Sequence, residues 1–114
     1  MAYTNTALTT AVTAVKNAAT YISLHTADPG TTGASEVTGG TYARKATTWG
    51  SVTNGSVTGS EVTLDIPSGT TITHWGLWTL ASGGTFYYGG ALAASESYGS
   101  NGTYAATPTL NAIN

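Results

Sequence analysis

The chain has no cysteine, so neither disulfide bonds nor thiolate metal sites can stabilise its fold. Charged residues are also scarce, at 7% of the 114 residues, against about one quarter in ordinary soluble domains. The formal net charge is -2, and only three residues are basic. Since affinity for a nucleic-acid backbone depends on many Lys and Arg contacts, nucleic acid is not an expected partner.

Long apolar runs are missing as well. No run approaches the roughly 18 residues that a membrane-spanning helix needs, and no basic segment leads into an apolar stretch near the N-terminus. We therefore expect neither a membrane partner nor signal-directed export. Apolar residues still make up 40% of the chain, with three Trp and seven Tyr, which is enough for a packed interior. A chain of this length forms one core, so residues 1–114 are expected to be one domain.

The first part of the chain is predicted to be helical. Apolar residues recur there at spacings of three and four, which predicts a helix within residues 1–19, with Asn5 or Thr6 as its N-cap. Threonines in the same segment are β-branched and lower its helix propensity. The apolar positions are Leu8, Val12, Val15 and Ala19.

Residues 20–113 alternate between apolar and polar positions, which is typical of strands. Residues 71–80 carry large apolar groups on both faces, which predicts a central strand covered on both sides. Asn54-Gly55 is a hairpin signal, and Pro108 suits an edge or a bulge. The fold class is therefore mainly β: a compact antiparallel β-sandwich or barrel-like domain with a short N-terminal α-helix. The other expected strands are residues 21–25, 42–49, 62–66, 85–94 and 103–113.

A long loop is predicted over residues 27–41. Asp28-Pro29-Gly30 is a turn signal, and glycines recur after it with no apolar period. Loops of this length inside compact domains are usually functional or ordered by a partner. Because the segment has few apolar residues of its own, we expect it to depend on a partner for its order.

Catalytic chemistry is not expected. His25 and Asp28 could meet across the turn as a dyad or as part of a metal site, but an exposed strand histidine and a turn-forming aspartate are favoured. His74 is interpreted as a satisfied core or interface histidine. No Gly-X-Ser-X-Gly elbow follows a strand, and the Gly-rich loop lacks the Lys that phosphate binding requires. The sequence therefore predicts no catalytic, cofactor-binding or metal-binding residues and no enzymatic activity.

Two sets of side chains remain as candidates for contacts. Arg44 and Lys45 are adjacent in an expected strand, so they point to opposite faces; one can pair with Glu36, and the other can meet an acidic partner surface. A set of aromatic residues could form a sugar-stacking platform, but a core or subunit-interface role is favoured. These aromatic residues are Trp49, Trp75, Trp78, Phe86, Tyr87 and Tyr88. The candidate partner or subunit contacts are His25, Asp28, Glu36, Tyr42, Arg44 and Lys45.

Several motifs occur together in residues 18–94. Leu-His-Thr-Ala-Asp-Pro-Gly spans residues 24–30, and Tyr-Ala-Arg follows at residues 42–44. Ile-Thr-His-Trp-Gly-Leu-Trp occupies residues 72–78, and Tyr-Gly-Gly-Ala-Leu occupies residues 88–92. The combination resembles a family of small tailed-phage virion structural proteins, described as head-decoration or tail-fibre-like proteins. Thr79, where relatives tend to have an acidic residue, and the weak final strand depart from that pattern.

The resemblance implies a bacteriophage virion structural protein. The main hypothesis is a capsid decoration or cementing protein that binds the major capsid protein and copies of itself, as a homo-oligomer such as a trimer, on the capsid surface. A short chain without a shaft or coiled-coil heptads favours it. The alternative is a tail-fibre or tail-tip module that binds host-surface glycan or protein. Both hypotheses place the protein in the virion after assembly in the bacterial host cytoplasm.

Overall fold

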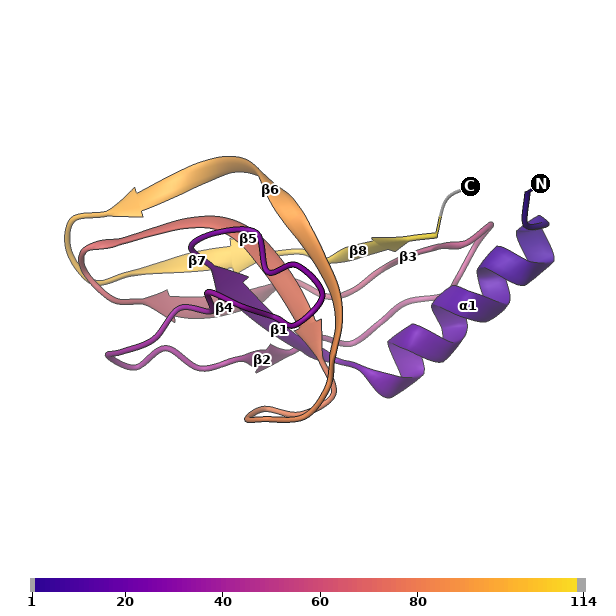
Figure 1. Ribbon diagram of the computed structural model, residues 1–114, viewed down its shortest axis with the longest axis horizontal. Helices are drawn as coiled ribbons and strands as arrows, with labels where there is room; N and C mark the ends of the chain where they lie inside the picture. The colour runs from indigo at the N-terminus through magenta and orange to yellow at the C-terminus, as the bar shows by residue number, and fades with distance from the viewer. Residues whose placement is uncertain (1, 113–114) are drawn as a thin grey trace.

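The structure, a computed structural model, describes residues 2–112 as one N-terminal helix followed by strands that pair antiparallel (Figure 1). The mainly β fold class predicted from the sequence is confirmed. Helix α1 spans Asn5–Ala18. The strands are β1 Tyr21–His25, β2 Lys45–Ala46, β3 Ser56–Thr58, β4 Val62–Ile66, β5 Thr70–Trp78, β6 Phe86–Tyr98, β7 Gly102–Ala106 and β8 Thr109–Asn111.

Helix α1 begins one residue earlier than the sequence pattern predicts. Thr4 is the N-cap, and its Oγ1 accepts a hydrogen bond of 3.1 Å from the Ala7 amide. The caps expected at Asn5 or Thr6 are therefore wrong, because both residues lie inside the helix. The predicted apolar stripe is confirmed, with Leu8 and Val12 buried on the face that packs toward β3.

A four-stranded sheet in the order β2-β1-β5-β6 forms the larger layer. The long strand β5 lies between β1 and β6, which confirms the prediction of a central strand. In the antiparallel register of β1 with β5, Ile22 lies opposite Leu77 and Leu24 opposite Trp75. Side chains of successive residues point to opposite faces, so these four share one face of the sheet.

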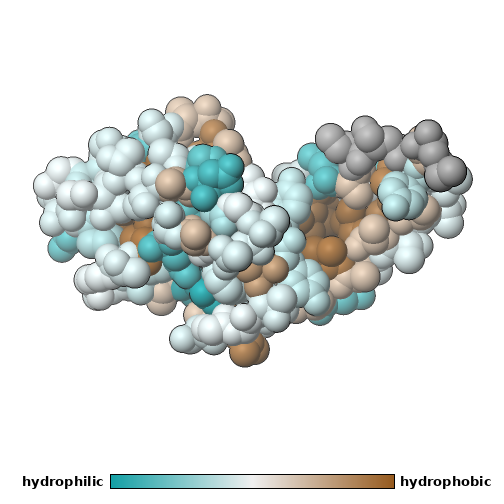
Figure 2. All heavy atoms as spheres, viewed as in Figure 1, coloured by the Kyte–Doolittle hydropathy of each residue, from teal (hydrophilic) through white to brown (hydrophobic). Residues whose placement is uncertain are grey.

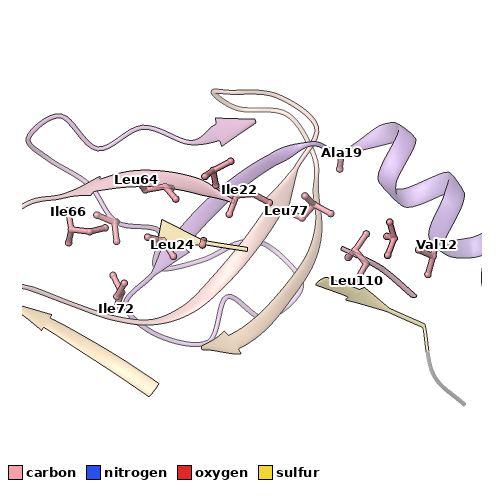
Figure 3. Close-up of a cluster of buried hydrophobic side chains, with 13 residues drawn as sticks. Val12, Ala19, Ile22, Leu24, Leu64, Ile66, Ile72, Leu77 and Leu110 are labelled. Atoms are coloured by element: carbon pink, nitrogen blue, oxygen red, sulfur yellow. The ribbon is translucent and has the colours of Figure 1, made fainter. Parts of the chain in front are cut away.

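The core fills the space between this face and two small sheets, β4–β7 and β3–β8. Figure 3 shows the buried side chains running from the sheets toward α1, where Val12 lies beside Leu110. The molecule measures 46 × 25 × 22 Å, with α1 and the β3–β8 pair at one end (Figure 1). Fully buried members of the core are Ile22, Leu24, Leu64, Ile66, Ile72 and Leu77.

Three strand predictions differ from the structure. The strand expected at residues 42–49 is reduced to β2, because residues 42–44 turn inward to a side-chain network. The strand expected at 103–113 is two strands, β7 and β8, separated at Pro108, which has no amide hydrogen to donate to a ladder. Residue 113 lies outside the described residues. The strand expected at 85–94 extends to Tyr98 as β6.

The predicted turn at Asn54-Gly55 is confirmed. Both residues have positive φ, 51° and 77°, as a two-residue hairpin turn requires. Thr53 and Ser56 exchange two backbone hydrogen bonds of 2.8 and 3.0 Å across it. The turn also contacts α1, because the Gly55 amide donates to Thr9 Oγ1 at 3.1 Å. The hairpin end is thereby fixed to the helix.

Leu77→Ala tests the position of the core. Leu77 is 0% exposed on the central strand, so its truncation is expected to lower the free energy of unfolding by about 2–5 kcal/mol. Leu80→Ala is the matched control, because Leu80 is 54% exposed and its truncation is expected to cost less than about 0.5 kcal/mol. Urea denaturation measures both values. Equal losses in the two variants would contradict the assignment of β5 as the central buried strand.

Candidate functional site

The face of the four-stranded sheet opposite the core is covered by the segment of residues 26–44. On this face Ser23 lies opposite Gly76, and His25 lies opposite His74. Ser23 and His25 are both 0% exposed. A Cβ at Gly76 would come within 2.7 Å of Ser23 Oγ and of the His25 ring, so only glycine fits there. Ser23 and His25 therefore lie directly against the backbone of Gly76, buried beneath the covering segment.

An ion pair between Glu36 and Arg44 forms the centre of this packing. Arg44 Nη2 donates to Glu36 Oε1 at 2.8 Å, and Arg44 Nε donates to Glu36 Oε2 at 3.0 Å. The two side chains are only 8% and 20% exposed for Arg44 and Glu36 respectively. The pairing predicted across the loop is thus confirmed, with the bidentate geometry that a guanidinium and a carboxylate favour.

Arg44 also binds the turn between β5 and β6. Its Nη1 donates to the carbonyl oxygens of Leu80 at 3.0 Å and Gly83 at 2.8 Å. Its guanidinium carbon lies 3.7 Å from the centroid of the Trp78 ring, a cation–π contact. One side chain therefore connects the loop that carries Glu36, the end of the central strand and the β5–β6 turn.

Tyr42 adds a further hydrogen bond to the carboxylate of this ion pair. Its hydroxyl donates to Glu36 Oε2 at 2.7 Å and accepts from the Leu24 amide at 3.0 Å. The Tyr42 hydroxyl thereby links the carboxylate to the backbone of β1. We call the set Glu36, Tyr42, Arg44 and Trp78 the loop clamp.

A directed chain of hydrogen bonds extends from the loop clamp to His25. Trp78 Nε1 donates to Ser23 Oγ at 3.0 Å, and Ser23 Oγ lies 2.7 Å from His25 Nε2. His25 Nδ1 lies 2.7 Å from the Ala34 carbonyl oxygen, which can only accept. Neutral His25 therefore carries its proton on Nδ1, and the Ser23 hydroxyl donates to Nε2. The interpretation of His25 as an exposed strand histidine is wrong, because the loop buries it.

Burial and neighbouring charges shift three pKa values in this network. Burial lowers the pKa of His25, although the Ala34 carbonyl and Glu36 act in the opposite direction. Burial raises the pKa of Glu36, but the hydrogen bonds and charge of Arg44 and the bond from Tyr42 outweigh it, so the net pKa is below its ordinary value. Burial, together with Glu36, strongly raises the pKa of Tyr42. The network therefore favours a neutral imidazole beside an ionised carboxylate.

The loop of residues 27–41 is held by contacts of its own. The Thr26 amide donates to Ser35 O, and the Val37 amide donates to Leu24 O, both at 2.9 Å. Val37 is buried, and Gly33 has a φ of 76° at a point where a Cβ would overlap the Trp78 ring. The chain itself thus supplies contacts that hold this segment, and its dependence on a partner for order stays a prediction.

The remaining candidates lie apart from the loop clamp. Asp28 Oδ1 accepts from the Gly30 amide at 2.9 Å, which confirms the turn-forming role. Lys45 is exposed on β2, on the side opposite the inward-pointing Arg44. His74 is half-buried, and its Nδ1 lies 2.7 Å from Thr73 Oγ1, as expected of a satisfied histidine. A partner contact by Asp28 or Lys45 stays a prediction.

Sequence reasoning did not place Ser23, Trp78 and Phe86 in this site. The signal that could have found them is the apolar character of both faces of β5, since a covered second face also buries its neighbours on β1 and β6. Phe86 packs edge-on against Trp78, with ring centroids 5.2 Å apart. Trp75 packs with Tyr88 at 5.4 Å on the core face. The aromatic residues are thus split between the two faces and do not form one exposed platform.

The polar contacts of the site join segments that are distant in the sequence. Ser23 and His25 have the contact of a nucleophile and its base, but both are fully buried. Among residues 2–112 no group of three or more His, Cys, Asp or Glu side chains could hold a metal ion. No helix in the same part of the chain is long and apolar enough to cross a membrane. The structure is thus a small β domain with an apolar core on one face of its main sheet and, on the other face, a polar network that holds a loop.

Comparison with known families identifies that domain further. Residues 2–110 match the family described as Podophage GP4 fiber I protein gp80, and the chain belongs to this family. It is therefore a bacteriophage virion structural protein, as the sequence resemblance implied. The description names a fibre protein, which fits the tail-fibre alternative better than the main hypothesis of capsid decoration. No curated protein sequence matches the chain.

Arg44→Lys tests the loop clamp. A lysine retains the charge but cannot reproduce the bidentate bond to Glu36 or the two bonds to the β5–β6 turn. We expect the free energy of unfolding to fall by about 2 kcal/mol and amide exchange to accelerate in residues 79–85. The control is Lys45→Arg, an exchange of the same two residue types at the exposed neighbouring position, which should change neither measurement. Unchanged exchange in Arg44→Lys would contradict the clamp.

The histidine network predicts a loss of stability in mild acid. The unfolded chain protonates His25 near pH 6.5, whereas the lowered pKa keeps the folded ring neutral, so the unfolded state gains protons first. Stability is therefore expected to be full above about pH 7 and to fall below about pH 6.5. Protonation of Glu36, whose folded pKa is also lowered, adds a further loss at more acidic pH. Thermal unfolding from pH 8 to pH 5 measures this dependence; a flat profile would refute it.

Proposed function

We propose that this chain is a structural subunit of a phage tail fibre. The observation that carries the proposal is the match to a fibre-protein family over residues 2–110, which is nearly the whole chain. The role is one of assembly and display, because the polar side chains that come closest to catalytic geometry are sealed beneath a loop.

The surface composition supports a role among many packed neighbours. With 7% charged residues, copies of the chain repel one another little at close range. Most exposed positions of the strands are instead Thr, Ser, Ala and Gly, such as Thr63 on β4 and Thr103 on β7. A surface of short hydroxyl side chains loses little conformational entropy when it is covered.

The loop clamp supports a binding role for the surface formed by the loop of residues 27–41 and the β5–β6 turn. Arg44 joins the loop of residues 27–41 to the β5–β6 turn, so both are ordered before any partner arrives. A surface that is already ordered avoids most of the entropy cost of binding. We propose this surface, with exposed Asp28, as the region that meets host-surface glycan or protein, while exposed Lys45, on the side opposite Arg44, is a separate candidate contact.

Copy number and position in the purified virion test the proposal. Quantitative mass spectrometry against the major capsid protein is expected to give a handful of copies per particle. Gold-labelled antibodies against the chain are expected to mark the tail in electron micrographs. Hundreds of copies with label over the head would overturn the proposal in favour of a decoration protein bound to the major capsid protein.

A further inference from the structure

Strand β6 is the outer strand of the four-stranded sheet, and it is unusually long. It spans Phe86–Tyr98, and within residues 2–112 no strand pairs with its outer edge. Proteins commonly protect such an edge with proline, lysine, other charges or β-bulges. β6 contains no Pro, Lys or Arg, and Glu96 near its end is its only charged residue. The edge is therefore open to pairing with another strand.

The register of β6 on β5 leaves its middle regular and turns Tyr87 outward. Leu77 lies opposite Tyr88 and Trp78 opposite Phe86, so Tyr87 is an extra residue on β6. Tyr87 is 46% exposed, as expected of a residue at a bulge. A second irregularity lies beyond Ala91. Residues 88–91 between the two bulges form a continuous ladder with β5 and present a regular outer edge.

An open apolar groove adjoins this edge. It has a volume of about 210 Å³ and lies between β6, α1 and β8. Figure 2 shows hydrophobic atoms in a hollow between the main body and the helical end of the molecule. No charged residue lines it. The lining residues include Val12, Val15, Tyr87, Tyr88 and Leu110.

A second hollow lies further along β6. Its volume is about 230 Å³, and it separates Ala91–Ala93 from β7 and Pro108. Trp75 and Tyr104 contribute rings to its wall. The core is thus incompletely covered along the length of β6, on the side where the sheet has no further strand.

We infer that β6 pairs antiparallel with β6 of a second copy of this chain, about a two-fold axis near residues 88–91. The pairing extends the sheet across two molecules and covers the hollows beside β6. It goes beyond the proposed function, because it concerns assembly and holds wherever in the virion the protein lies.

Size and symmetry favour a second copy as the occupant. The members of β6 and of the two linings that are not buried are about as many as the lower end of one side of a standard interface, roughly 20–30 residues. A two-fold interface brings the same surface of both copies together, so β6 of one copy lies against β6 of the other. At the opposite end of the sheet, β2 has only two residues and offers little to a head-to-tail partner.

Charge also favours this arrangement. In an antiparallel pairing centred on residues 88–91, the two copies of Glu96 lie at opposite ends of the paired strands and do not face each other. The apolar groove carries no charge to be buried without a partner. No unpaired buried charge therefore opposes the gain from covering apolar surface and completing backbone hydrogen bonds.

Single-cysteine variants test the pairing directly, because the chain has no cysteine of its own. Tyr87→Cys, Ala91→Cys and Ala93→Cys place thiols at exposed positions along β6. An axis at residue 89 sets position 87 opposite position 91 of the second copy, and an axis at residue 90 sets position 87 opposite position 93, so the variants are oxidised both singly and mixed in equal amounts. At least one single or mixed sample is expected to form a covalent dimer at a yield several times that of Thr63→Cys. Thr63 is an equally exposed strand residue on β4. Yields no higher than this control in all single and mixed samples would overturn the inference.

Sedimentation equilibrium provides the second measurement. The wild-type chain is expected to show a monomer–dimer equilibrium, and Ala91→Lys is expected to raise its dissociation constant at least tenfold. Thr63→Lys adds the same charge away from β6 and should leave the constant unchanged. A wild-type chain that stays monomeric, or that assembles only as a species of three copies, would overturn two-fold pairing. If Ala91→Lys fails to fold, as judged by circular dichroism, the cysteine series alone decides.

Discussion

The bidentate ion pair between Arg44 and Glu36 is the interaction on which the loop-covered face of the four-stranded sheet depends. It replaces an apolar core on the side of the sheet that faces the loops. A guanidinium that is 8% exposed needs a partner for most of its donors, and here the carboxylate and two turn carbonyls accept four hydrogen bonds. Because those acceptors come from two separate segments, the loop of residues 27–41 and the β5–β6 turn, satisfying one side chain fixes both.

The sheet therefore has two faces that are stabilised differently. One face packs aliphatic residues against the small sheets and α1, and the other packs polar residues beneath a loop. The polar face allows little freedom, since Gly76 has no room for a Cβ and His25 must hold one tautomer. The apolar face is more permissive, and along β6 it remains partly open. Loops held together by the loop clamp and an unpaired edge on β6 are properties expected of a component that binds further copies of itself.

Membership of the fibre family and the low content of charged residues agree with a domain that has a loop-covered polar face and an unpaired strand edge. A virion component is held in place by repeated contacts, so it needs little charge to keep copies apart in solution. The features that distinguish a fibre subunit from a decoration protein lie in what surrounds the chain. The fold itself, a small β domain with fixed loops, serves either setting. The family match is for this reason the observation that favours the tail.

The sequence by itself determined the fold class, the helix and its apolar stripe, the central strand β5, the Asn54-Gly55 turn and the pairing of Glu36 with one of Arg44 and Lys45. All of these follow from local periodicity, turn chemistry or the scarcity of charged partners. Only the tertiary structure decided that His25 is buried, that a polar network lies beneath residues 27–41, that Arg44 is the residue that pairs with Glu36, and that Pro108 separates two strands. These outcomes depend on which segments lie above β5, and the energy of covering a polar face comes from hydrogen bonds between residues far apart in the chain, which no local pattern encodes.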